Sequence, residues 1–564
     1  MTHQYLMSLF RIVFLGILFF NSVLGFAQSD ESNVNQKGKW GEIHGSVQFD
    51  AQYYSQDSVI RTPPVPEKFL FNGFADLMYT KGKFTAGLRY EGYFNVLQGF
   101  DQRYDGHGVP YRYASFDADF LHITVGGFYE QFGSGMILRA YEERGLGWDT
   151  FIEGARVKAH VLGGVYLKAL IGKQRFFFEH GEGLVRGFDG EISLNETFNA
   201  LSEKKTRLTL GGSFVSKYQE DNDSDLELPE NVGAWAARFN LLHGGFNLSG
   251  EYVWRGQDPQ ASNTLVTESG EVRPNYNTGN TFLATASYSQ KGLGVVVSAK
   301  RTDNMNFRSD RNATLFDLNI NFLPALTNQH TYLLAASLYP YATQPNGEWA
   351  IQADVSYKIP RKSALGGKYG MNVSANFSRI HGINQILNEN GTEYRTNFFE
   401  LGQLYFQDIN FEVNKKINKD HKITLKYLNL IFDIETIQGL SGAEPVKANI
   451  GIVEMTHKLA KKHAIRWELQ GLFTRQHFRD WAALLLEYTW SPHFFAAFIG
   501  QYNYSNPEVS QRIVYPVIQL GYIKDATRIT IQYGRQRAGI FCVGGVCRNV
   551  PSSNGVALSI LTSF

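Results

Sequence analysis

After its first 27 residues, the sequence contains no apolar run that could cross a membrane as a helix, because none approaches the roughly 18 uninterrupted apolar residues that such a helix needs. It also lacks an excess of either charge, with 54 Lys and Arg residues against 53 Asp and Glu residues. A nucleic-acid-binding surface would need a basic excess, so we expect no nucleic-acid partner. If the chain resides in a membrane, it must cross with strands.

Linear signatures of catalysis are also missing. The sequence contains no zinc-binding His-Glu-x-x-His, no Walker phosphate loop and no dinucleotide-binding glycine fingerprint. A hydrolase can still be assembled from side chains on separate strands, but solvated lumen or interface histidines are the favoured interpretation of the four candidates, His44, His122, His160 and His457. We therefore expect no enzyme activity, no cofactor and no metal site.

The N-terminal 27 residues have the layout of a secretory signal peptide. Arg11 supplies the positive charge, residues 12–20 form the apolar core, and Gly25 and Ala27 are the small residues expected before the cleavage site. We expect residues 1–27 to be removed and residues 28–40 to form a short periplasmic segment. No cysteine follows the apolar core, so a lipoprotein anchor is not indicated.

Alternation of apolar and polar residues recurs from residue 41 to the end of the chain. Ile43, Val47, Phe49 and Tyr53 interleave with polar residues, and the same period of two is found in residues 246–254, 371–378 and 465–473. This pattern, with 42 Phe and 30 Tyr residues, is typical of a transmembrane barrel whose apolar row contacts lipid and whose polar row faces the lumen. We predict an all-β, antiparallel, up-and-down barrel over residues 41–564, with roughly 26 strands and 24 to 28 plausible.

The predicted connections alternate in length, as in barrels with short periplasmic turns and longer outer loops. This alternation places both termini in the periplasm. The short connections are at residues 81–82, 243–245, 291–292, 418–420, 461–462, 491–492 and 524–525, and the long ones are at 57–67, 95–109, 130–150, 256–279, 381–399 and 537–553.

The last strand carries an apolar row that ends in an aromatic residue, Phe564. Leu558, Ile560 and Phe564 share one face, which we expect to contact outer-membrane lipid. This ending resembles the assembly signal that the barrel insertion machinery of Gram-negative bacteria reads. The resemblance implies that this machinery is a partner of the chain.

Two segments have the most distinctive sequences in the chain. They are residues 128–135 (FYEQFGSG) and residues 139–149 (RAYEERGLGWD). They carry a resemblance of the whole chain to large uncharacterised, porin-like outer-membrane β-barrel proteins of Gram-negative bacteria. The resemblance implies an outer-membrane location and a barrel fold, and it brings no activity. TonB-dependent receptors are similar in size, but we expect too few residues before the first strand for their N-terminal plug domain.

Charged residues within the predicted strands are expected to face the lumen. A basic residue facing lipid near the midplane would cost about 2–4 kcal/mol. Charge pairs that stiffen the wall are the favoured interpretation, and a polar path that orients a passing solute is the alternative. The candidates are Arg89, Glu91, Arg156, Lys158, Lys422, Lys426, Arg466 and Glu468.

The connection over residues 130–150 combines glycines with both signs of charge. It could fold inward and constrict the lumen, although an ordered surface loop is the favoured interpretation. Its charged residues are Arg139, Glu142, Glu143, Arg144 and Asp149.

The only two cysteines, Cys542 and Cys547, flank a Val-Gly-Gly-Val sequence in the last long connection. After export, a disulfide between them is favoured over two free thiols. A metal site is not indicated, because two thiolates without a neighbouring histidine are too few ligands.

These features favour a passive outer-membrane channel or transport conduit for polar solutes. The alternative is a plugged barrel that serves a secretion or surface-display partner, and an unknown periplasmic or surface partner is compatible with both. An outer-membrane hydrolase is the least favoured hypothesis.

Overall fold

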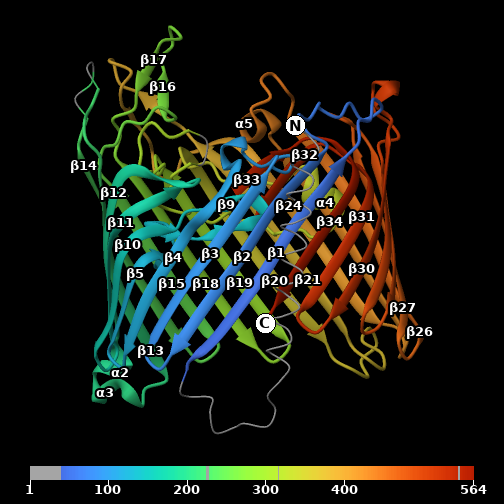
Figure 1. Cartoon of the computed structure of the whole chain (residues 1–564), viewed down its shortest axis with the longest axis horizontal. Coiled ribbons are helices and arrows are strands. Elements are labelled where there is room, and N and C mark those ends of the chain that lie inside the picture. Colours follow the sequence, from blue (N-terminus) through green and yellow to red (C-terminus); the bar gives the residue numbers. More distant parts are fainter. Residues whose placement is uncertain (1–39, 224–225, 227, 315–316, 544–545) are drawn as a thin grey trace.

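The computed structural model describes residues 40–223, 226, 228–314, 317–543 and 546–564, without the side chains of residues 541–543, 546 and 548. The predicted signal peptide, residues 1–27, and the predicted periplasmic segment up to residue 39 lie outside the described residues. Twenty-four antiparallel strands form one closed barrel (Figure 1). None of the helices in the described ranges is long and apolar enough to cross a membrane.

The barrel strands follow the order of the chain around the ring. They are β1 (Glu42–Tyr54), β2 (Phe69–Lys81), β3 (Phe84–Phe94), β4 (Gly106–Ala118), β5 (Leu121–Phe128), β10 (Ile152–Leu162), β11 (Val165–Phe176), β12 (Glu179–Ser193), β13 (Thr206–Tyr218), β14 (Asn231–His243), β15 (Phe246–Arg255), β18 (Gly279–Gln290), β19 (Leu293–Asp303), β20 (Gly347–Ile359), β21 (Met371–Ile383), β24 (Leu401–Lys416), β25 (His421–Phe432), β26 (Val446–Ala460), β27 (His463–Thr474), β28 (Trp481–Trp490), β29 (Phe494–Tyr502), β30 (Val514–Lys524), β31 (Thr527–Gln536) and β34 (Ser553–Ser563).

Shorter elements lie in the connections. They are η1 (Gln102–Tyr104), β6 (Glu130–Phe132), β7 (Leu138–Ala140), β8 (Glu142–Glu143), η2 (Arg144–Leu146), β9 (Trp148–Asp149), α2 (Leu194–Thr197), α3 (Asn199–Ser202), β16 (Thr264–Val266), β17 (Val272–Pro274), α4 (Leu333–Ser337), β22 (Ile386–Leu387), β23 (Tyr394–Arg395), α5 (Ile434–Gln438), η3 (Val509–Gln511), β32 (Gly539–Val543) and β33 (Val546–Val550).

The first and last strands close the ring. β1 pairs with β34 from Ser46 opposite Ser563 to Tyr54 opposite Gly555. Beyond the strand, Phe564 exchanges backbone hydrogen bonds of 2.9 and 3.0 Å with Gly45. The Phe564 ring lies over Gly45, where a Cβ atom would come within 2.4 Å of the ring, so the terminal aromatic covers the seam on the face that carries Phe49.

The expected number of about 26 strands is two too high, although 24 lies within the predicted range. All the short predicted turns join barrel strands at one end of the barrel, which we call the turn end, and the predicted long connections lie at the opposite end, the loop end (Figure 1). The connection with α2 and α3 is a longer one that lies at the turn end. The connection between β19 and β20, residues 304–346, is long enough for two further strands, but its described residues, 304–314 and 317–346, do not join the wall.

The outer surface of the wall is apolar. Large apolar side chains on alternate positions are exposed, including Leu77, Val125, Ile171, Trp235 and Leu469. Residues next to them along the strands, such as Thr124, Leu170 and Glu468, are buried and point to the other face, so the period of two sorts lipid-facing from lumen-facing residues. This apolar outer surface on a closed ring is the architecture of an outer-membrane β-barrel.

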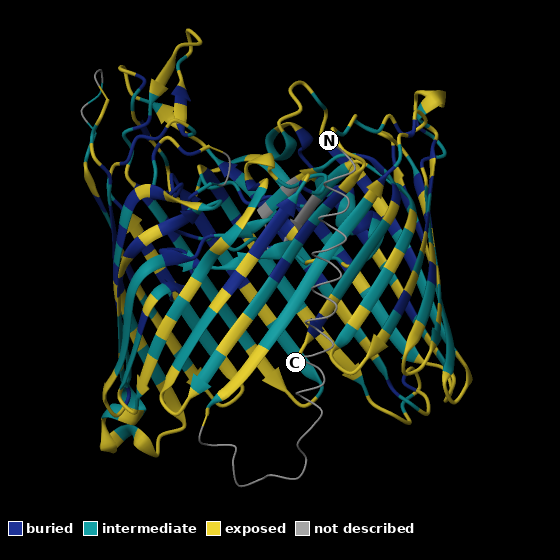
Figure 2. Cartoon of the chain, in the orientation of Figure 1, coloured by how far each residue is buried: buried dark blue, intermediate teal, exposed yellow. Residues whose placement is uncertain are grey.

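The buried residues gather in the half of the barrel toward the loop end (Figure 2). Two apolar clusters lie there, each joining wall residues to residues of a connection that folds inward. We call residues 129–151 the first inner segment and the described residues 304–314 and 317–346 the second inner segment. They give the interior a core at a level where an empty ring of this size would hold water.

Candidate functional site in the barrel interior

The first inner segment packs its apolar residues onto the inside of the wall. Phe132, Met136, Ile137 and Leu138 have no exposed surface. They form one cluster with wall residues of β11 to β15, namely Leu170, Val185, Val215, Ala234 and Val253. The segment therefore lies inside the barrel, contrary to the favoured expectation of a surface loop. The apolar run at residues 136–138, within a glycine-rich polar connection, is the sequence signal for this inward packing.

Buried ion pairs fasten the first inner segment to β3 and β11. The Asp149 carboxylate pairs with Arg89 and lies 2.7 Å from Arg175, and it accepts a hydrogen bond of 3.0 Å from the Tyr129 hydroxyl. Glu91 pairs with the same two arginines at 2.7 and 2.6 Å. Two acids and two guanidinium groups thus compensate each other in a dry region.

The period of two in β11 does not predict that Arg175 faces the interior. Lys168 and Leu170 place even-numbered β11 residues inward, but the register shifts between Lys173 and Arg175. This irregularity turns Arg175 toward the interior, where it is 3% exposed.

The other charged residues of the first inner segment have different partners. Glu142 lies 3.0 Å from Arg89 and 2.6 Å from Arg144, and Arg144 reaches Asp76 on β2 at 3.0 Å. The Glu143 carboxylate accepts a hydrogen bond from the Gly145 amide. Burial raises the pKa of Glu142, which outweighs the opposing effect of Arg89 and Arg144.

One carboxylate of this segment is surrounded by three cations from the wall. Glu130 lies 3.4 Å from Arg156, 2.7 Å from Lys158 and 3.1 Å from Lys168. Burial alone would raise the pKa of Glu130, but Lys158 and Lys168 outweigh it and the pKa is lowered. We call these four residues the basic cluster. Its two lysines keep 39% and 30% of their side-chain surface exposed, so solvent reaches this part of the interior.

A second cluster with the inverse composition lies on β26 to β28. Arg466 is surrounded by three carboxylates, at 3.5 Å from Glu454, 3.6 Å from Glu468 and 3.2 Å from Glu487. We call these four residues the acidic cluster. β10 and β26 are the sixth and eighteenth strands of the 24-strand ring, so the two clusters occupy opposite walls.

The two remaining candidate lumen charges lie beside the acidic cluster on β25. Lys426 pairs with Glu412 at 3.3 Å. Lys422 is exposed and lies nearer to the turn end.

The second inner segment was not recognised in the sequence. Its Leu334, Leu338 and Tyr339 are at most 5% exposed. They pack with wall residues of β20 to β30, among them Ala350, Phe406, Leu428, Ile450, Leu472, Trp481 and Tyr515. The apolar rows on the inside of these strands are the signal that a further segment covers them, because a water-filled lumen would not favour them.

Polar contacts tie the second inner segment to β20, which follows it in the chain, and to β24. Lys300 on β19 and Glu348 on β20 form a buried pair at 2.6 Å, and the Tyr341 hydroxyl donates to Glu348. His330 lies 2.7 Å from Asp408 on β24. Burial, followed by the charge of Glu348, raises the pKa of Tyr341 well above its ordinary value, so the hydroxyl stays protonated.

The two inner segments also bind each other. The Arg139 amide donates to the Ile320 carbonyl at 2.9 Å, and the Phe322 amide donates to the Gly135 carbonyl at 3.0 Å. The Arg139 guanidinium lies between the Tyr141 and Phe322 rings, 4.3 and 4.2 Å from their centroids. The segments therefore form one body, anchored to strands on all sides of the ring.

The β32–β33 hairpin, which carries both cysteine candidates, contacts the inner segments, because β32 lies against α4 and η2. Cys542 and Cys547 are opposite each other in the β32–β33 hairpin, and Cys547 is disulfide-bonded, while the Cys542 side chain lies outside the described residues. His44, His122, His160 and His457 lie on four different strands. Within the described ranges, no hydrogen bond links any of these four to a serine hydroxyl, and no group of three ligand side chains could hold a metal ion.

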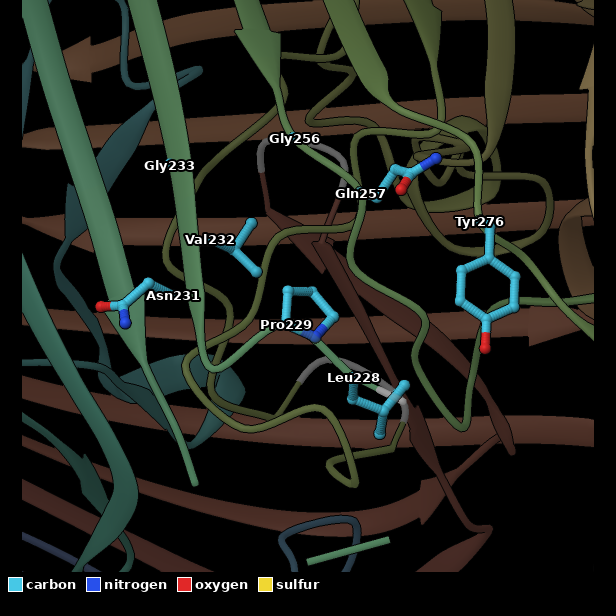
Figure 3. A pocket seen from close by; sticks show the side chains of 8 residues that line it. All are labelled: Leu228, Pro229, Asn231, Val232, Gly233, Gly256, Gln257 and Tyr276. Atoms are coloured by element: carbon cyan, nitrogen blue, oxygen red, sulfur yellow. The ribbon is translucent and has the colours of Figure 1, made fainter. Parts of the chain in front are cut away.

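Two cavities lie beside strands β14 and β15, and the smaller one also adjoins the first inner segment. The larger, of about 470 Å³, lies at the loop end between the start of β14 and the connection after β15, with Val232, Gly256 and Tyr276 in its lining (Figure 3). The smaller, of about 280 Å³, lies under the β6–β7 hairpin and is lined by Gly133, Ser134, Arg238 and Glu251, among others.

Comparisons with known proteins add a family and a general likeness. The model of a family of unknown function, DUF6029, matches residues 7–564. No curated protein is similar to the sequence.

Among solved structures, the siderophore receptor PirA from Pseudomonas aeruginosa is 9% identical, with a TM-score of 0.39 over 94% of this chain and 81% of its own. The P pilus usher (PapC) translocation pore is 8% identical, with a TM-score of 0.42 over 92% of this chain and 99% of its own. The outer membrane protein opdK from Pseudomonas aeruginosa is 10% identical, with a TM-score of 0.32 over 93% and 97%. Likenesses at this level carry no argument about function.

Proposed function

We propose that this chain, which belongs to the DUF6029 family of unknown function, is an outer-membrane transport barrel whose polar conduit is closed toward the loop end by the two inner segments. The turn end faces the periplasm in this proposal, because short turns face that compartment in such barrels. The chain acts as a conduit and performs no chemical reaction.

The observation that carries the proposal is the pair of inverse charge clusters on opposite walls. The basic cluster holds three cations around Glu130, and the acidic cluster holds three carboxylates around Arg466. Each cluster has an uncompensated charge, and its exposed groups contact solvent. If these charges only stiffened the wall as ion pairs, the positive and negative charges within each cluster would cancel. An excess of opposite sign on facing walls instead creates a field across the lumen, which orients polar solutes.

The inner segments supply the closure. A ring of 16 to 18 strands already leaves an aqueous channel, and 22-stranded transporters contain a plugged lumen, so an open ring of 24 would be a wide hole. Here the two inner segments that close the lumen are connections between consecutive barrel strands and do not form a separate domain. Besides the apolar packing, ion pairs and hydrogen bonds tie the inner segments to the wall, and these polar contacts can exchange for water when a segment moves.

A plugged interaction barrel is the second candidate, and the apolar contact between the inner segments and the wall favours it. That contact is as dry as a protein core. In this alternative the inner segments never leave, and the barrel displays its loops, such as the β16–β17 hairpin that projects at the loop end (Figure 1), to a partner.

Conductance of the purified protein in planar bilayers separates the two. We expect rare or small openings from the complete chain and stepwise, ohmic conductance after deletion of residues 131–146. Deletion of residues 264–274, which removes the projecting hairpin and no inner contact, is the matched control and should leave the conductance unchanged. Silence of the 131–146 deletion in a correctly assembled barrel would contradict the conduit and favour the interaction barrel.

A further inference from the structure

The smaller cavity lies where the tip of the first inner segment meets the wall. The β6–β7 hairpin contributes Gly133 and Ser134 to its lining, and strands β12 to β15 contribute residues that include Glu191, Arg238 and Glu251. The cavity of about 280 Å³ is large enough for a small organic solute but not for a polymer.

The charged groups around this cavity leave an excess of negative charge. Arg238 is engaged with two carboxylates, at 2.8 Å from Asp189 and 3.2 Å from Glu191, and it also donates to the Ser213 hydroxyl. Glu251 is a third carboxylate. In the described part of the chain, no cation lies within 4.0 Å of it.

Glu251 has one oxygen in use and one without a partner. Its Oε2 accepts a hydrogen bond of 2.8 Å from the Ser134 amide. Its Oε1 is buried and accepts no hydrogen bond from any described residue, and the residue as a whole is 7% exposed. A buried carboxylate oxygen without a donor is costly, so the cavity is complementary to a ligand that brings a hydrogen-bond donor and a positive charge.

The hairpin tip is shaped to approach this carboxylate. Gly133 has a φ of 52°, and a Cβ atom there would lie 2.6 Å from Glu251 Oε1. Only glycine therefore allows the tip to lie so close to the carboxylate. Thr209, Asn240 and Ser249 add hydroxyl and amide groups to the lining, which suit a small polar solute.

We propose that this cavity is a binding site for a small organic cation of the primary amine class, with Glu251 as its counter-ion. The inference extends the proposed function, since a conduit would bring the solute to this site. Binding itself does not require the barrel to conduct.

Calorimetric titration of the complete protein in detergent tests the proposal with three four-carbon probes. Putrescine carries two ammonium groups, 1,4-butanediol is neutral and succinate carries two carboxylates. We expect heat of binding from putrescine alone. Glu251→Gln keeps an acceptor for the Ser134 amide and removes the charge, so it should weaken putrescine binding by about tenfold or more. The matched control, Glu203→Gln at the exposed residue after α3, should leave the affinity unchanged.

A second variant guards against an indirect effect through the hairpin. Ser249→Lys places an ammonium group in the cavity without removing the Glu251–Ser134 hydrogen bond, and it should exclude putrescine. No binding to the native protein, equal binding of the diol, or unchanged affinity in Glu251→Gln would each overturn the proposal. Putrescine binding by a barrel that never conducts would support the site and contradict the conduit.

Discussion

Asp149 is the residue through which the closure of the lumen can be weakened most selectively. Its carboxylate joins Arg89 on β3 to Arg175 on β11, and both guanidinium groups are at most 3% exposed. Asp149→Asn keeps the shape and removes the charge. Breaking one partner out of a buried ion pair costs about 3–5 kcal/mol. We take the lower limit, about 3 kcal/mol, because Glu91 still pairs with both arginines.

This cost applies only while the first inner segment is docked, since the arginines become hydrated when it leaves. The ratio of open to closed time in planar bilayers should therefore rise roughly a hundredfold in Asp149→Asn. The matched control is Asp354→Asn, because Asp354 accepts a hydrogen bond of 2.7 Å from Asn376 and forms no ion pair within the described ranges. Equal opening in the native protein and in Asp149→Asn, or an equal rise in the control, would refute this account of the anchor.

Three further predictions concern other parts of the barrel. Replacing Lys422 and Lys426 together by Glu should shift the reversal potential in a salt gradient toward cation selectivity, and an unchanged potential would show that they do not line the conduit. Burial and a nearby arginine lower the pKa of His477 to about 4, below its unfolded value of 6.5. The unfolded chain therefore binds the proton more tightly than the folded chain does. The thermal unfolding midpoint should fall as the pH drops from 6.5 toward 4. His477→Asn, which tolerates the φ of 52°, should reduce this pH dependence, and an equal dependence in both proteins would assign it elsewhere. Phe564→Ala should lower the yield of heat-modifiable, folded barrel in the outer membrane. The control Phe494→Ala, which replaces an exposed aromatic residue away from the seam, should not lower it. Equal yields of the two variants would contradict a role of the terminal ring in assembly.

The wall of the barrel could be predicted from the sequence because lipid and water impose a period of two on each strand. Residues such as Ile43 and Phe49 follow that period, and the turns at residues 81–82 and 461–462 interrupt it. The resemblance to uncharacterised outer-membrane barrels agrees with the family match, which covers residues 7–564.

The contents of the barrel could not be predicted in the same way. Inward-facing Leu428, Leu430 and Phe432 make β25 apolar on both faces near the loop end, so the alternation disappears where the second inner segment covers the strand. Arg175 faces inward only because the strand is irregular there. Contacts between the two inner segments, such as that of Arg139 with Phe322, join residues far apart in the chain and leave no periodic signal.

The access of a thiol reagent from outside the cell tests the closed interior most directly. Single cysteines at Ala140 in the first inner segment and Ala335 in the second, 4% and 7% exposed, can be compared with one at Ser269 in the exposed turn between β16 and β17. In intact cells, a membrane-impermeant maleimide should label Ser269→Cys quickly and the two interior positions very slowly. Labelling of Ala140→Cys or Ala335→Cys as fast as Ser269→Cys would show that the inner segments do not fill the barrel, and the account of a closed conduit would be wrong.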